Sequence, residues 1–191
     1  MRILAVADEE SAVIREYWKE NGYNDVDLIV SCGDLSGEYL EDIAKNLGCP
    51  LLYVKGNHDA MLGKPRGAEC IDCSIMEING IRICGFSSID RWGRVLSEHR
   101  MRRKTERMRR RIVKNGGIDV LVTHHPILGV GDGDDKFHRG YEAFRELVDA
   151  VKPRFVLYGH VHLSYKAGAK RVIEYGETTV INAYEKTFIE I

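Results

Sequence analysis

Residues 28–37 of this chain read LIVSCGDLSG, in which the apolar run Leu28–Cys32 leads directly into Gly33 and Asp34. Short apolar runs rich in β-branched residues are typical of strands that are buried on both faces. The chain repeats this arrangement in four other places: Ile3–Ala7 leads into Asp8-Glu9-Glu10, Leu51–Val54 into Gly56-Asn57-His58-Asp59, Val120–Thr123 into His124-His125-Pro126, and Phe155–Tyr158 into Gly159-His160-Val161-His162. Ligands of open α/β sheets bind beyond the carboxyl ends of the strands. Five such strands lying side by side would therefore bring these polar residues to one rim of one sheet.

The remaining pattern alternates helices with strands. Strands are predicted at 2–7, 27–32, 51–55, 119–123 and 155–158, with helices at 11–21, 37–47, 97–114 and 140–151. Asn79-Gly80 between the apolar runs 75–78 and 81–84 predicts a hairpin with a type I′ turn, and three more strands are expected at 171–175, 178–181 and 187–191. Parallel βα units combined with hairpins predict an α/β fold, a four-layer α/β/β/α sandwich of two mixed sheets flanked by helices. We expect one domain over residues 1–191.

The composition is that of an ordinary globular protein, with 44% hydrophobic and 30% charged residues and a formal net charge of −1. No apolar run approaches the roughly 20 residues that a membrane-spanning helix needs, so no membrane partner is expected. The five cysteines are an odd number, which favours reduced thiols. The chain opens on a predicted strand rather than on an export signal, and we expect a cytoplasmic protein.

The residues after the strands are ligand types for metal ions. In extended segments Asp8 and Glu10 would project to the same side, and so would His160 and His162. The donors number seven: Asp8, Glu10, Asp34, Asn57, His124, His160 and His162. Seven donors are too many for one zinc-like ion but suit two divalent ions that share a bridging carboxylate. Mixed oxygen and imidazole donors suit Mn²⁺, iron or Zn²⁺ better than Ca²⁺ or Mg²⁺.

Four of these blocks, Gly33–Gly37, Gly56–Asp59, His124–Pro126 and Gly159–His162, resemble the signature blocks of the calcineurin-like metallophosphoesterases in order and spacing. The resemblance implies a binuclear site and a small phosphoester as substrate. Asp8, Asp34 and His162 would hold the first metal, with Glu10 where the family usually has histidine. Asp34 would bridge to the second metal, held by Asn57, His124 and His160.

The resemblance also implies the reaction. A hydroxide between the metals would attack phosphorus in line, His58 would meet the leaving group, and Asp59 would orient His58. Asp-Glu-Glu at 8–10 resembles a prokaryotic branch of the family. A carboxylate in place of imidazole is a harder donor, so we expect Mn²⁺ or Fe²⁺ to be favoured over Zn²⁺. Small members of the family often lack the caps that enclose monoesters, which favours a phosphodiesterase over a monoesterase.

Three further residues are candidates for binding substrate. His125 lies one residue from a predicted ligand, and His138 and Arg139 belong to the charged, glycine-rich loop 131–140 that should overhang the site. The arginine guanidinium offers phosphate a two-pronged donor.

The segment 91–114 holds eleven Lys or Arg against two Glu. Met101, Met108 and Ile112 recur in it at helical spacing, so a solvated helix face is the favoured interpretation. The second interpretation is that these cations attract anionic substrate over a long range. Two other functions stay open. One is a nuclease or nucleic-acid-binding protein that uses the basic helix 97–114, which is not favoured. The other is a non-catalytic interaction scaffold, which would predict more eroded ligands than the one departure at Glu10.

Overall fold

The computed structural model describes residues 1–14, 25–164 and 169–191. Its strands form two sheets. Strands β1 (Arg2–Val6), β2 (Leu28–Ser31), β3 (Leu51–Tyr53), β4 (Glu69–Cys70) and β11 (Thr187–Glu190) make the first, in the order β11-β1-β2-β3-β4. The second contains β5 (Ile75–Ile78), β6 (Ile81–Phe86), β7 (Val120–Thr123), β8 (Phe155–Tyr158), β9 (Val172–Tyr175) and β10 (Thr178–Asn182), in the order β5-β6-β7-β8-β10-β9.

Both sheets are mixed. In the first, β1, β2 and β3 run parallel and β11 pairs antiparallel with β1. In the second, β6, β7, β8 and β10 run parallel, while β5 and β9 are antiparallel edge strands. Asn79 and Gly80, which connect β5 to β6, have φ values of 51° and 80°, as a type I′ turn requires.

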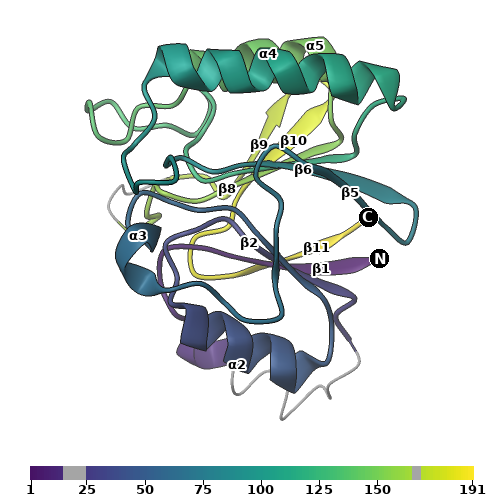
Figure 1. Cartoon of the computed structure of the whole chain (residues 1–191), viewed down its shortest axis with the longest axis vertical. Coiled ribbons are helices and arrows are strands. Elements are labelled where there is room, and N and C mark those ends of the chain that lie inside the picture. Colours follow the sequence, from purple (N-terminus) through teal and green to yellow (C-terminus); the bar gives the residue numbers. More distant parts are fainter. Residues whose placement is uncertain (15–24, 165–168) are drawn as a thin grey trace.

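Helices cover the outer face of each sheet (Figure 1). Helix α2 (Gly37–Leu47) packs its apolar side on the first sheet, and α4 (Glu98–Lys114) and α5 (Glu142–Val151) pack on the second. A third apolar cluster joins the inner faces of the two sheets. These three buried layers confirm the predicted α/β/β/α sandwich.

The helices begin and end where local chemistry dictates. The Ser36 hydroxyl accepts a hydrogen bond from the Tyr39 amide and caps α2, and Gly48 ends that helix in the left-handed region (φ 65°). Ser97 caps α4 in the same way through the Arg100 amide. The predicted helix over 11–21 falls largely outside the described residues. One short element was not predicted, the four-residue helix α3 (Asp59–Leu62).

One expectation is wrong in a way that matters for the site. The five strands that end in polar residues do not share one sheet, because β1, β2 and β3 belong to the first sheet and β7 and β8 to the second. The polar residues therefore gather where the carboxyl ends of two packed sheets meet. Hydrogen bonds cross this junction, as in the contact of 2.8 Å between His124 Nδ1 and the Cys32 carbonyl.

Candidate metal centre

Three residues at the junction have left-handed backbone conformations that side chains rarely adopt. Their φ values are 66° for Asp8, 60° for Asp34 and 69° for His160. Such strained residues persist where surrounding contacts hold them, and they cluster at functional sites. Here the Asp8 amide donates to the Gly33 carbonyl at 3.1 Å, and the His160 amide donates to the Asp8 carboxylate at 2.8 Å.

This backbone corrects the same-side argument. The chain turns sharply at Asp8 and His160 instead of continuing as an extended strand. Glu10 is exposed, and its Oε1 accepts a hydrogen bond of 2.6 Å from the Ser36 hydroxyl. His162 lies with its ring 4.7 Å from that of Tyr184, while the His160 ring lies among other histidines. The alternation of an extended strand therefore does not describe how either pair is arranged, and the shared ligation of Asp8 and Glu10 stays a prediction.

The centre of the site is formed by His124, Asp34 and Asn57. The His124 Nε2 atom lies 2.9 Å from Asn57 Oδ1 and 3.2 Å from Asp34 Oδ2. The His124 side chain is fully buried, and 7% of the Asp34 side chain is exposed. Burial is the largest single influence on His124 and disfavours the charged ring, but the hydrogen bond with Asp34, the charges of Asp8 and Asp34 and the contact with the Cys32 carbonyl together outweigh it and raise the pKa of His124 to about 9. Burial is also the largest single influence on Asp34 and opposes its ionisation, but the hydrogen bond and charge of His124 and the hydrogen bond from the His58 amide together lower the pKa of this carboxyl.

Glycines make this close approach feasible. A Cβ atom on Gly56 would lie 2.6 Å from His124 Cε1 and would also collide with the Asp34 carboxylate. A Cβ atom on Gly33, whose φ is 99°, would lie 2.9 Å from Gly56 Cα and 3.0 Å from His124 Nδ1. The glycines that precede Asp34 and Asn57 in the sequence therefore let two loops and one imidazole meet.

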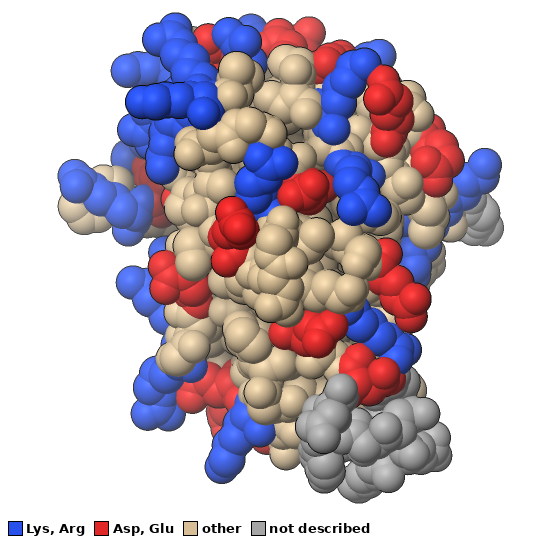
Figure 2. Space-filling model, turned by 90° about the vertical axis from the view of Figure 1, so that its right-hand side faces the viewer, with Lys and Arg blue, Asp and Glu red and all other residues tan. Residues whose placement is uncertain are grey.

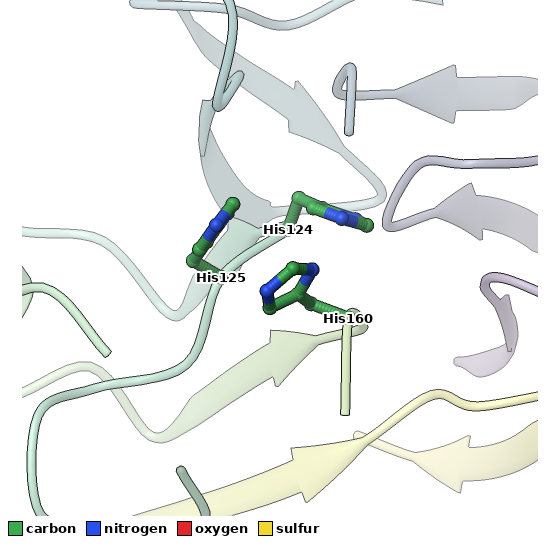
Figure 3. A group of neighbouring side chains, drawn as sticks. All are labelled: His124, His125 and His160. Carbon is green, nitrogen blue, oxygen red and sulfur yellow. The ribbon is translucent and has the colours of Figure 1, made fainter. Parts of the chain in front are cut away.

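Three imidazole rings lie together at the end of the second sheet, His124 and His125 from one segment and His160 from the next (Figure 3). Each offers a nitrogen within 4.8 Å of the others, and the His125 and His160 rings stack with their centroids 3.9 Å apart. Burial lowers the pKa of His125 to about 2 and that of His160 to about 4. Both rings are therefore neutral near pH 7, the form that binds a metal or accepts a hydrogen bond.

Backbone carbonyls hold two of these rings in the way that metal-ligating histidines are usually held. His124 Nδ1 contacts the Cys32 carbonyl at 2.8 Å, and His160 Nε2 contacts the Phe137 carbonyl at 2.7 Å. One nitrogen of each ring is thus occupied, and the other is left for a cation. A second group, Asp8, Asp34 and His124, also has its ligand atoms within 4.8 Å of one another.

The charge at this second group also fits a cation. Burial raises the pKa of Asp8 to about 6, with the nearby Asp34 adding to the shift. Two buried carboxylates beside each other are costly to ionise, and a divalent ion offsets that cost. The residues present therefore fit divalent metal with mixed oxygen and imidazole ligands.

The segment after β3 contributes two neighbouring side chains to the site, His58 and Asp59. The His58 side chain is exposed, and the Asp59 side chain is turned inward. The His58 amide donates to Asp34 Oδ1 at 2.7 Å, while its side chain lies at the surface. Asp59 Oδ2 accepts from the Asp34 amide at 2.9 Å and from the Gly56 amide at 2.5 Å. Asp59 therefore ties two loops of the site together through their backbones. Its expected role in orienting the His58 ring stays a prediction.

The candidate substrate residues line a cleft of about 740 Å³ that also contains His58 and His160. His125 contributes its ring, with Nδ1 2.7 Å from the Ser88 hydroxyl oxygen, and His138 and Arg139 contribute the overhanging loop. A second cavity of about 710 Å³ shares His138 and reaches His162. The loop 131–140 thus separates two cavities that flank the metal centre.

Sequence reasoning missed two residues at the carboxyl end of β10, Asn182 in the strand and Tyr184 after it. The Tyr184 hydroxyl donates to the Glu9 carboxylate, and its ring lies against His162. The Asn182 side-chain amide donates to the Val161 carbonyl at 2.7 Å. The signal was present, because the apolar run 178–181 also ends in polar residues at the carboxyl end of a parallel strand.

The basic helix makes many contacts with acidic side chains. Arg102 contacts Glu142 at 2.8 Å and Glu146 at 3.0 Å on α5, and Lys104 contacts Asp72 at 2.8 Å. Met101, Met108 and Ile112 are buried, as the helical spacing predicted. Among the described residues, no helix is long and apolar enough to cross a membrane.

Comparison with known proteins places the chain in a family. A crystal structure of TT1561 from Thermus thermophilus superposes with a TM-score of 0.61 at 12% identity, covering 96% of this chain and 89% of that one. Another crystal structure gives a TM-score of 0.70 at 15% identity, covering 98% and 94%. At these identities the likeness shows the fold alone.

In sequence, the chain is 42% identical over 72 residues to the UPF0046 protein C25E10.12 of Caenorhabditis elegans. The match covers 35% of this chain and 24% of that protein. The family model for calcineurin-like phosphoesterases matches residues 1–164, most of the chain and every predicted ligand. This protein therefore belongs to the calcineurin-like phosphoesterase family.

Proposed function

We propose that the protein is a two-metal phosphoesterase that hydrolyses phosphodiesters in preference to monoesters. The observation that carries the proposal is the arrangement around His124. Its Nε2 atom faces an amide oxygen and a carboxylate, while its Nδ1 atom is held by the Cys32 carbonyl. An oriented imidazole beside two oxygen donors is what a catalytic metal site requires.

The ligand assignment follows the predicted blocks. Asp8, Glu10, Asp34 and His162 would hold one ion, and Asp34, Asn57, His124 and His160 the other. When bound, two divalent ions polarise phosphoryl oxygens and supply a nucleophile from water near neutral pH. The carboxylate at Glu10 favours Mn²⁺ or Fe²⁺ over Zn²⁺.

Side chains of the cleft would bind the leaving group and the non-reacting oxygens of the substrate. His58 is exposed and lines the cleft beside the centre, and it would give a proton to the leaving oxygen. Arg139 and His138 lie across the same cleft and would bind the non-reacting phosphoryl oxygens. Asp59 holds the backbones of Asp34 and Gly56, which keeps the cleft wall in place.

Room on both sides of the centre supports the preference for diesters. A phosphodiester carries two ester groups, and two cavities, of about 740 Å³ and 710 Å³, both have His138 in their walls. One group would enter each cavity, whereas a monoester would fill only one.

A substrate screen tests the proposal. Metal-stripped protein would be supplied with Mn²⁺, Fe²⁺, Zn²⁺ or Mg²⁺ in turn and offered bis-p-nitrophenyl phosphate and p-nitrophenyl phosphate. We expect Mn²⁺ or anaerobic Fe²⁺ to give the fastest turnover and the diester to exceed the monoester in kcat/KM. A monoester preference with every metal would contradict the diester assignment. If protein with verified metal content turned over neither ester, the proposal that this protein is a phosphoesterase would be contradicted.

A further inference from the structure

The three most exposed large hydrophobic side chains of the described residues belong to the cleft wall or to segments next to it. Met61 is 92% exposed, Phe137 69% and Trp92 67%. Phe137 lines the cleft together with His58, and Met61 is three residues beyond His58 on α3. Trp92 belongs to the loop next to α3, because a Cβ atom on its neighbour Gly93 would lie 2.6 Å from Ala60 Cβ.

Cations accompany these side chains in a repeated pattern. We call residues 58–67, 89–95 and 135–139 the rim. Each of its three segments contains two Lys or Arg and one Asp, whereas the whole chain has a net charge of −1. Twice the cation lies over the exposed aromatic ring, with Arg91 4.5 Å from the centroid of Trp92 and Lys136 4.8 Å from that of Phe137.

The three aspartates of the rim are engaged within the protein. Asp59 accepts backbone hydrogen bonds at the metal centre, Asp90 contacts Arg94 and Arg100 at 2.9 Å each, and Asp135 contacts His138 at 2.7 Å. Two cations of the rim are also paired, Arg94 with Asp90 and Arg66 with Glu41 at 3.2 Å. Within the described residues no ion pair holds Lys64, Arg91, Lys136 or Arg139, so the rim presents these four cations together with its apolar side chains.

Within the described residues, no other part of the protein covers these side chains. Helix α3 buries none of its residues, although it carries Met61. On the side of the molecule facing away from α3, Lys and Arg are interspersed with Asp and Glu (Figure 2). Protruding apolar side chains grouped on one surface mark a site of association.

We propose that the rim docks on the surface of an anionic lipid bilayer. Met61, Trp92 and Phe137 would enter the boundary between headgroups and acyl chains, and Lys64, Arg91 and Lys136 would face lipid phosphates. Aromatic and aliphatic side chains flanked by Lys and Arg are suited to this boundary, which is apolar on one side and negatively charged on the other. The contact is peripheral, and it turns the mouth of the cleft toward the bilayer. It departs from the expectation of no membrane partner, and it does not depend on bound metal or on turnover.

Vesicle sedimentation tests the proposal. The protein would be spun with vesicles of phosphatidylcholine alone and with equimolar phosphatidylglycerol and phosphatidylcholine, at low ionic strength and at about 0.5 M salt. We expect binding to the anionic vesicles that weakens at high salt. The triple variant Met61→Ser, Trp92→Ser, Phe137→Ser should partition at least tenfold less, and its far-ultraviolet circular dichroism should be unchanged because these side chains are exposed.

A matched control separates the rim from surface hydrophobicity in general. Val113 and Val172, 62% and 48% exposed, lie on α4 and β9 outside the rim, and Val113→Ser with Val172→Ser should leave vesicle binding unchanged. Equal losses in the rim and control variants would overturn the proposal, as would equal binding to uncharged vesicles or none to anionic ones. Retention of a short oligouridylate without vesicle binding would assign the rim to nucleic acid instead.

Discussion

A methyl group added at Gly56 should disable the site while leaving the protein folded. The Cβ atom of Gly56→Ala would lie 2.6 Å from His124 Cε1, about 0.8 Å short of the 3.4 Å at which ordinary contact begins, and it would also meet the Asp34 carboxylate. The Gly56 amide is fixed by Asp59, so the His124 and Asp34 side chains must move. Displacement of reacting groups by about 1 Å can cost roughly 100-fold in rate.

The assay pairs activity with metal content and stability. We expect Gly56→Ala to lower kcat/KM for bis-p-nitrophenyl phosphate by about 100-fold and to weaken metal binding, measured by elemental analysis after dialysis. Overpacking should reduce the free energy of unfolding by about 1–3 kcal/mol.

Gly85→Ala is the control, because its Cβ atom would lie 2.6 Å from Ile71 Cγ1 and 2.7 Å from Val54 Cγ1 in the core, away from the ligands. If Gly56→Ala loses no more activity than Gly85→Ala at a similar loss of stability, the packing argument for the site is refuted.

Three other variants or conditions probe individual residues. His58→Ala should lower kcat for a diester with a poor leaving group by about 10²–10⁴ with both metals retained, and by less for nitrophenyl esters; loss of metal instead would make His58 a ligand. Glu10→Ala should weaken metal binding and Glu10→His should shift preference toward Zn²⁺, as followed by metal titration; unchanged dependence in Glu10→Ala would remove this acid from the ligand set. Removing the proton from His124, whose pKa is about 9, costs about 3 kcal/mol at pH 7, so metal affinity of the metal-free protein should rise about tenfold per pH unit up to pH 9. In the metal-free protein, the protonated His124 ring contributes its full stabilisation of the fold below pH 6.5, the ordinary pKa of histidine. That contribution is lost as the pH rises through about 9, the pKa of His124 in the fold. Calorimetry in buffers of different ionisation enthalpy would show the released proton, and pH-independent affinity would refute the coupling.

The sequence predicted the layers because its periodicities are strong. The apolar runs that became β1, β2, β3, β7 and β8 are short and bounded by glycine, proline, histidine or charged residues, and α2 occupies the predicted residues 37–47. Periodicity does not tell which strands pair, so the division of the five strands between two sheets was not predictable from their ends. The one-domain assignment for residues 1–191 stays a prediction.

The site was less predictable in its details. Left-handed backbone at Asp8 and His160 depends on contacts between distant segments, such as the hydrogen bonds from the His160 amide to the Asp8 carboxylate. The carbonyl of Phe137 that holds His160 carries no sequence signal at all, since any residue has a carbonyl. Ser88, which contacts His125 Nδ1 at 2.7 Å, lies in a loop without a recognisable motif.

The proposed function requires two divalent ions to act together at the junction of the sheets. Metal-stripped protein would be titrated with Mn²⁺ while bound metal per chain and turnover of bis-p-nitrophenyl phosphate are measured on the same samples. We expect turnover to rise with bound metal and to reach its plateau at two ions per chain. The Asp34→Asn variant should bind less metal and turn over more slowly. Full turnover without metal, or a plateau at a single ion, would contradict the proposed function.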